Sequence, residues 1–220
     1  MRLTLFDLDH TLLDGDTDEL WCQFLMAPGV LDQAVFEPRN QAMARDYRAG
    51  TVSTEDFCNF YVGTMAGRSP HEWLDLRGEF TATQIVPRLW SSAATLVARH
   101  HDAGDLVVLT TATNRFLSEP AAAQLNIAHL IATECEFDVQ GRFSGRNRGT
   151  PNMREGKVQR LNEWLAARSL VFADCESTMY SDSINDLPLL CAVQQPIAVN
   201  PDDQLRAQAQ QRGWQIVALQ

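Results

Sequence analysis

The chain has 220 residues, of which 45% are hydrophobic and 21% charged, and its formal net charge is -10 at pH 7. This length and composition suit a soluble enzyme with one full core and a small second domain, and the acidic balance argues against a nucleic-acid partner, because phosphate backbones are held chiefly by Lys and Arg. The amino terminus reads as a strand rather than a long apolar helix, so we expect no signal peptide, no membrane span and a cytoplasmic location.

The first predicted element is a buried strand over residues 1–5. It ends in the stretch FDLDHTLLDGD, in which Asp7 and Asp9 are separated by one leucine. Side chains two residues apart on a strand point to the same side, so these two carboxylates are expected to lie close together at the carboxyl end of the strand. Such a pair is repulsive unless positive charge shares the site.

Helical spacing follows over residues 16–85. Asp16 and Glu19 have the spacing of a helix N-cap, and Ser69 and Glu72 have that of a capping box. Between them, one helix is expected to begin near Pro38 and another to follow residue 53. We therefore predict a helical cap domain over residues 16–85. The core domain would then consist of residues 1–15 and 86–220.

From residue 86 onward, helical and strand patterns alternate. Helices are predicted over residues 90–99, 116–125 and 156–167, strands over 106–110, 129–132, 178–180, 196–199 and 214–219, and a hairpin over 136–144. This alternation predicts an α/β fold, a Rossmann-like parallel sheet with helices on both faces. In an open parallel sheet the ligand site lies outside the carboxyl ends of the strands.

Three of these strand ends carry acids or hydroxyls. They are Asp7-Leu8-Asp9, Thr110-Thr111-Ala112-Thr113, and the run from Tyr180 through Asp182, Asn185 and Asp186. Aspartates without neighbouring His or Cys suit a hard, oxygen-seeking cation, and a site that also admits phosphate suits Mg²⁺.

In this order the residues resemble the motifs of the haloacid dehalogenase superfamily, whose members are mainly phosphohydrolases. The stretch that starts at Asp7 is similar to the first motif, Thr111 to the second, Lys157 to the third, and Asp182 with Asp186 to the fourth. A helical insertion straight after the first motif is similar to subfamily IB, the branch that contains phosphoserine phosphatase.

The resemblance implies a Mg²⁺-dependent phosphomonoesterase that acts through an aspartyl-phosphate intermediate on a small soluble phosphate ester. Asp7 would be the nucleophile and Asp9 the general acid and base. Mg²⁺ would be held by the Asp7 carboxylate, the Asp9 backbone carbonyl and Asp182.

The remaining motif residues would act on the phosphoryl group or support those that do. Thr111 and the amides of Ala112 and Thr113, at a helix start, would donate to phosphoryl oxygens. Thr110 competes with Thr111, because a one-residue error in the strand end exchanges them. Lys157 would place a fixed positive charge beside the nucleophile. Asp186, with Asn185 beside it, would orient Lys157 or metal-bound water.

The substrate is expected to be an amino-alcohol phosphate similar to phosphoserine or histidinol phosphate. Asp16 stands nine residues after the nucleophile, where phosphoserine phosphatases carry a glutamate that helps bind the substrate's amino group. The Thr-Ala-Thr sequence replaces their usual Ser-Gly-Gly, and both departures argue against phosphoserine itself. Asp14, Asp16 and Asp18 still suit a substrate that carries an amine.

Two alternatives stay open at the level of function. One is a phosphotransferase of the same fold, and the other is a phosphate-binding module without turnover. Outside the motifs, Arg142, Arg146 and Arg148 could guide an anionic substrate or simply be solvated, and His100-His101 is expected to be a solvated surface pair. No pattern indicates an oligomeric state.

Overall fold

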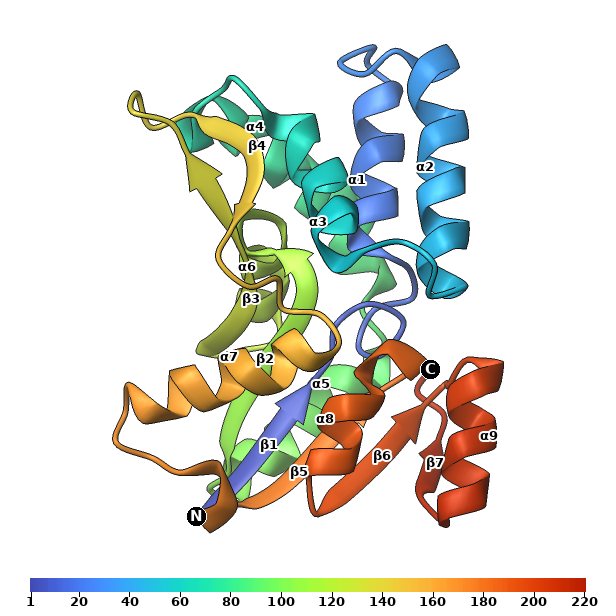
Figure 1. Ribbon diagram of the computed structural model, residues 1–220, viewed down its shortest axis with the longest axis vertical. Coiled ribbons are helices and arrows are strands. Elements are labelled where there is room, and N and C mark those ends of the chain that lie inside the picture. The colour runs from blue at the N-terminus through green and yellow to red at the C-terminus, as the bar shows by residue number, and fades with distance from the viewer.

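A sheet of seven strands in the order β4-β3-β2-β1-β5-β6-β7 forms the centre of the protein (Figure 1). The computed structural model describes residues 1–220, except for the side chain of Arg48. Neighbouring strands are parallel, apart from the antiparallel pair β3 and β4. The strands span Arg2–Phe6 (β1), Leu106–Asn114 (β2), His129–Phe137 (β3), Phe143–Arg148 (β4), Glu176–Ser181 (β5), Gln195–Val199 (β6) and Gln215–Val217 (β7). The structure confirms the predicted α/β fold with a Rossmann-like sheet.

Helices cover both faces of the sheet, and the side chains of β1 show why. Leu3 and Leu5 share one hydrophobic cluster with α7, α8 and α9, whereas Phe6 shares another with α5 and α6. All three side chains are fully buried, as expected of a parallel strand that reads as an apolar run. These helices span Ser91–Asp102 (α5), Arg115–Gln124 (α6), Glu155–Ala166 (α7), Leu187–Ala192 (α8) and Asp203–Arg212 (α9).

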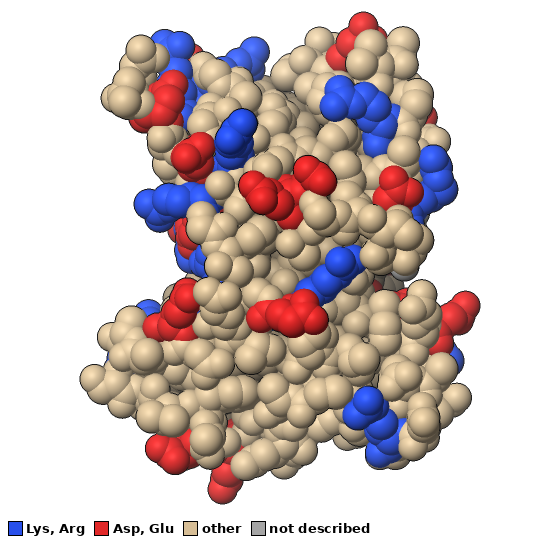
Figure 2. All heavy atoms as spheres, in the orientation of Figure 1, with Lys and Arg blue, Asp and Glu red and all other residues tan. Residues whose placement is uncertain are grey.

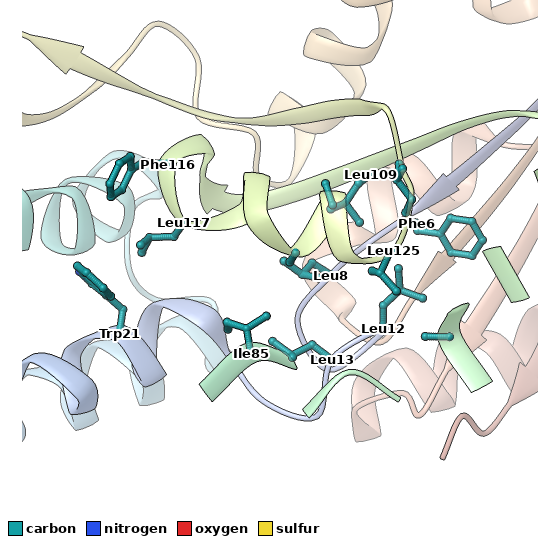
Figure 3. Packing of buried hydrophobic residues seen from close by; sticks show 14 of the residues in the cluster. Phe6, Leu8, Leu12, Leu13, Trp21, Ile85, Leu109, Phe116, Leu117 and Leu125 are labelled. Carbon is teal, nitrogen blue, oxygen red and sulfur yellow. The ribbon is translucent and has the colours of Figure 1, made fainter. Parts of the chain in front are cut away.

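The loop after β1 is fixed by its apolar residues. Leu8, Leu12 and Leu13 are fully buried and pack with Phe6 and with residues of the helices around them (Figure 3). Leu8 lies between the two acids of the first motif, so its burial holds the backbone that carries both of them. A rigid loop of this kind suits a site that must position reacting groups.

Residues 16–85 form the helices in the upper part of Figure 1. Three of the predicted helix starts are confirmed: Asp16 accepts a hydrogen bond from Glu19 N (2.9 Å), Ser53 accepts one from Asp56 N (3.0 Å), and Ser69 and Glu72 form a capping box. The helices span Thr17–Met26 (α1), Gln33–Arg48 (α2), Thr54–Val62 (α3) and Pro70–Phe80 (α4).

The predicted start of α2 is wrong. The helix begins at Gln33, with the Asp32 side chain accepting from Ala34 N, so that Pro38 lies inside it. A proline inside a helix costs a backbone hydrogen bond, which made the first turn the expected place for Pro38. The N-cap at Asp32 and the packing of α2 on α1 outweigh that local cost.

The division into a core domain and a cap domain remains a prediction. The β3–β4 hairpin packs against the helical segment, with Gly67 N donating to Phe143 O (2.9 Å) and Asn147 N donating to Asn59 Oδ1 (2.8 Å). The helical segment therefore contacts the rest of the chain through this hairpin as well as through its two connections.

His100 is not the solvated residue that the sequence suggested. Its Nδ1 lies 2.7 Å from Asp105 Oδ2 and its Nε2 lies 2.9 Å from Tyr180 Oη. The neighbouring His101 is exposed, as predicted. His100 therefore faces the sheet and His101 faces solvent. The sequence places the two residues side by side and does not show which of them faces the sheet.

The charged side chains visible in Figure 2 are mixed in sign. On that face, Lys and Arg side chains are separated by acidic and uncharged ones. None of the helices in the described part of the chain combines the length and the apolar character that crossing a membrane requires.

Candidate active site

The carboxyl ends of β1, β2 and β5 open into a cavity of about 460 Å³ below the helical segment. Its lining includes these residues that the sequence predicted for the site: Asp7, Asp9, Asp16, Thr111, Ala112, Thr113, Lys157, Asp182, Asn185 and Asp186. The parallel pairing of β1 with β2 and with β5 brings these ends together. Asp14 is exposed and lies outside the lining.

Lys157 is the centre of the buried charge network. Its Nζ donates to Asp7 Oδ1 and to Asp186 Oδ2, both at 2.7 Å, and Ser181 Oγ donates to the same Asp186 oxygen at 2.8 Å. Burial would lower the pKa of Lys157, but the two carboxylates outweigh it and raise the pKa above its usual value. The ammonium group therefore stays charged.

Asp7 and Asp182 lie on either side of the Thr11 hydroxyl. Thr11 Oγ1 donates to Asp182 Oδ1 (3.1 Å), lies 3.5 Å from Asp7 Oδ2, and accepts from Asp182 N (3.0 Å). Burial raises the pKa of Asp7 to about 7 although Lys157 lowers it, and burial with the charge of Asp7 raises the pKa of Asp182. Thr11 was not predicted for the site, although it lies inside the first motif.

The donors around Thr11 fit a hard dication. Two carboxylates with raised pKa values are stabilised when positive charge comes between them, and oxygen donors are those that Mg²⁺ prefers. Among the described side chains, no three His, Cys, Asp or Glu residues form a metal-binding group. The carboxylates that lie around Thr11 are those of two side chains, Asp7 and Asp182.

Asp9 turns its carboxylate toward the start of α1. Oδ1 accepts from Thr17 N (2.8 Å) and from the Thr17 hydroxyl, and Oδ2 accepts from Thr113 Oγ1 (2.8 Å). These contacts orient the acid and tie it to the beginning of the helical segment. Thr17 was not predicted, and only its place beside the helix N-cap hinted at it.

The second motif separates its two threonines. Thr111 lines the cavity, whereas Thr110 Oγ1 accepts from Asn152 Nδ2 (3.0 Å) on the opposite side of β2. Ala112 and Thr113 belong to the end of β2 rather than to the first turn of α6, which Asn114 caps. The Thr113 amide already donates to Thr111 Oγ1 (3.2 Å).

The helical segment supplies acids and aromatic rings to the cavity. Asp18 accepts from Asn114 Nδ2 (3.5 Å) and lies 3.3 Å from Thr113 Oγ1. Burial, followed by the charge of Asp9, raises the pKa of both Asp16 and Asp18. The rings of Tyr47 and Phe57 complete this side.

The basic cluster of the hairpin does not belong to the site. Arg142, Arg146 and Arg148 are exposed, and none of them lines the cavity. Apart from Lys157, no described Lys or Arg side chain lines it. The interpretation of these arginines as solvated surface charges is the one that the structure supports.

Known proteins match this chain over most of its length. The family model of the haloacid dehalogenase-like hydrolases matches residues 4–190. A histidinol-phosphatase of Neisseria meningitidis serogroup C is 38% identical over 217 residues, which cover 98% of this chain and 98% of that protein. A phosphoserine phosphatase of Mycobacterium tuberculosis is 31% identical over 221 residues, which cover 96% of this chain and 68% of that protein.

Solved structures share the architecture. A protein of unknown function from Bordetella pertussis superposes with a TM-score of 0.92 at 46% identity, and the match covers 98% of this chain and 97% of that one. A phosphoserine phosphatase that carries an analogue of the phospho-aspartyl intermediate superposes with a TM-score of 0.71 at 14% identity, with 99% and 92% covered. The second likeness shows a common fold.

Proposed function

The chain belongs to the haloacid dehalogenase-like hydrolases and is a phosphatase of the phosphoserine phosphatase-like kind. On that premise, we propose that it hydrolyses a small amino-alcohol phosphate through an aspartyl-phosphate intermediate at Asp7. The contact between Lys157 Nζ and Asp7 Oδ1 (2.7 Å) carries the proposal. It fixes one oxygen of the carboxylate and leaves Oδ2 for attack on phosphorus.

The reaction would take two displacements. In the first, an oxygen of Asp7 attacks phosphorus, the bond between phosphorus and the ester oxygen breaks, and Asp9 gives its proton to the leaving alkoxide. In the second, Asp9 takes a proton from a water that attacks the same phosphorus, and Asp7 leaves as a carboxylate. Thr17 and Thr113 orient Asp9 for both proton transfers.

Positive charge and hydrogen-bond donors would hold the phosphoryl group. Lys157 places a buried ammonium beside it, and Thr111 offers a hydroxyl. Asp7, Asp182 and the Asp9 carbonyl would hold Mg²⁺, which would supply positive charge to offset the repulsion between a carboxylate and an anionic ester. Asp186 holds Lys157 in place.

The helical segment would act as the cap that encloses the alcohol part of the ester. Asp16 and Asp18 face the cavity, and the raised pKa of each means that a nearby cation would be stabilising. A protonated amine on the alcohol meets that requirement.

We place the activity in the cytoplasm, where free thiols are stable, because all five cysteines are unpaired.

The test is release of inorganic phosphate from histidinol phosphate, phosphoserine and glycerol 3-phosphate, with and without Mg²⁺, by the native protein and by Asp7→Asn. We expect Mg²⁺-dependent release from an amino-alcohol phosphate that disappears in the variant. Transfer of the phosphoryl group to an added alcohol, with little inorganic phosphate, would indicate a phosphotransferase instead. Phosphate binding without any turnover would indicate a binding module.

A further inference from the structure

Two aromatic rings form one wall of the cavity on the side of the helical segment. Tyr47 lies at the C-terminal end of α2, which points toward the sheet in Figure 1, and Phe57 lies on α3. The rings stack with their centroids 4.3 Å apart and their planes 27° apart. Phe57 is 3% exposed, and its ring also packs edge-on against Tyr61, with the ring centroids 5.0 Å apart. Packing on both sides therefore holds the Phe57 ring in place.

The Tyr47 hydroxyl is available to a ligand. It makes no hydrogen bond with any of the described residues, whereas Trp21 Nε1 and Trp73 Nε1 in the same segment donate to Thr64 Oγ1 and Met65 O. Burial raises the pKa of Tyr47, followed by the charges of Asp186, Asp7 and other acids of the site. The phenol is therefore protonated, and it lies within the electrostatic reach of the reacting carboxylates.

Beside this wall lie two acids of the helical segment, Asp16 and Asp18, that no described side chain pairs with a cation. Asp16 accepts from the Glu19 amide, and Asp18 contacts Asn114 and Thr113, all of them neutral donors. Neither Asp16 nor Asp18 has an ion pair with any described Lys, Arg or His side chain. A ligand group next to them is favoured if it is cationic and disfavoured if it is a carboxylate.

We propose that Tyr47 and Phe57, together with Asp16 and Asp18, form a leaving-group subsite that selects phosphate esters whose alcohol carries both an ammonium group and a flat, nitrogen-containing ring. The inference rests on the proposed phosphatase function. The ammonium group lies against the two acids, the ring packs on the aromatic wall, and the Tyr47 hydroxyl bonds a ring nitrogen. Histidinol phosphate has this chemistry, whereas phosphoserine brings a carboxylate and no ring.

The cavity volume is consistent with such a ligand. About 460 Å³ is within the range of small-molecule sites and exceeds what a phosphoryl group alone requires. The phosphoryl group is fixed at Asp7 by the chemistry of the proposed reaction. The rest of the ester must then extend toward the helical segment, where Tyr47 and Phe57 lie.

The experiment compares two esters that share the ammonium group and differ in the ring. We would measure kcat/KM for phosphate release from histidinol phosphate and from phosphoethanolamine with saturating Mg²⁺. The native enzyme is expected to favour histidinol phosphate by about 100-fold, and Tyr47→Leu and Phe57→Leu are each expected to lower that ratio by about tenfold. Tyr47→Phe, which keeps the ring and loses only the hydroxyl, should lower it by about threefold.

Phe36→Leu is the matched control. Phe36 lies on α2 like Tyr47, but its ring packs on Phe60 (5.9 Å) and does not line the cavity, so the ratio should stay as in the native enzyme. A native ratio near one would overturn the proposal, and so would a ratio that Tyr47→Leu and Tyr47→Phe leave unchanged while both rates fall together. No phosphate release from either ester by the native enzyme would instead refute the proposed function.

Discussion

Lys157 Nζ lies 2.7 Å from Asp7 Oδ1, although the two residues are 150 positions apart in the sequence. The same ammonium group lies 2.7 Å from Asp186 Oδ2, so one cation serves two buried carboxylates. The Thr11 hydroxyl lies between the other Asp7 oxygen and Asp182, at 3.5 and 3.1 Å, and burial with the charges of Asp7 and Asp186 raises the pKa of Asp182. Three acids, Asp7, Asp182 and Asp186, therefore share one ammonium group. This excess of negative charge favours the binding of a dication.

Asp7→Asn is expected to abolish phosphate release while the protein stays folded. An amide has nearly the shape of the carboxylate but is a far weaker nucleophile, so we expect kcat to fall by about 10³-fold or more. Phosphate release and the far-ultraviolet circular dichroism spectrum would be measured in parallel. Asp14→Asn, an exposed acid outside the cavity, should behave as the native enzyme. An active Asp7→Asn protein would contradict the proposed mechanism.

Lys157→Met is expected to destabilise the protein as well as to inactivate it. The side chain is 3% exposed, and its loss leaves Asp7 and Asp186 buried without a cation, which costs about 3–5 kcal/mol of unfolding free energy. Urea unfolding with a chelator present measures this. The loss of unfolding free energy should become smaller as the pH falls from 8 to 5, because the carboxylates then bind protons. Adding Asp186→Asn to Lys157→Met should restore part of the lost unfolding free energy. A deficit independent of pH would show that lost packing dominates.

Mg²⁺ is expected to be required for activity and to stabilise the native protein. Chelation should stop phosphate release, and added Mg²⁺ should restore it. The ion should also raise the melting temperature, because it relieves the repulsion between Asp7 and Asp182. In Asp182→Asn we expect the Mg²⁺ concentration for half-maximal activity to rise by about tenfold or more. An Asp182→Asn protein with unchanged Mg²⁺ dependence would remove that residue from the metal site.

Thr111→Val and Thr110→Val form a matched pair on neighbouring positions. Thr111 lines the cavity, so its valine variant should lose about 10²-fold in kcat/KM if the hydroxyl donates to the phosphoryl group. Thr110 bonds Asn152 away from the cavity, so Thr110→Val should lower the free energy of unfolding by about 1–3 kcal/mol and leave KM unchanged. The opposite pattern would assign the catalytic hydroxyl to Thr110.

Glu134 is expected to stabilise the protein at neutral pH and to lose that effect in acid. Burial would raise the pKa of Glu134, but the hydrogen bonds and charge of Arg115, aided by Arg160, lower it below its usual value of 4.5. Because the folded pKa lies below the unfolded one, the stabilisation is complete above pH 4.5 and disappears as the pH falls through the folded value. Unfolding free energies of the native protein and Glu134→Gln should therefore converge as the pH falls below 4.5. The exposed Glu176→Gln variant should show no such convergence.

The sequence by itself determined the class of fold and the strand ends at which the polar residues of the site stand. Hydrophobic periodicity and polar strand ends are local properties, so the alternation of strands and helices and the places of Asp7, Thr111 and Asp182 could be predicted before any coordinates. Local signals failed where they were weak. Pro38 displaced the predicted start of α2, and the six-residue helix α8 and the mostly polar helix α9 were not predicted.

Only the tertiary structure decided how the candidate residues meet. Thr11 and Asp182 are 171 positions apart, and the pairing of β1 with β5 brings them within 3.1 Å. Tyr47 and Phe57 lie on different helices, α2 and α3, and the packing of their rings makes them a wall of the cavity. Contacts of this kind depend on the way distant segments pack. The periodicity of a single segment shows which of its faces is buried, but it does not show which partner that face will meet.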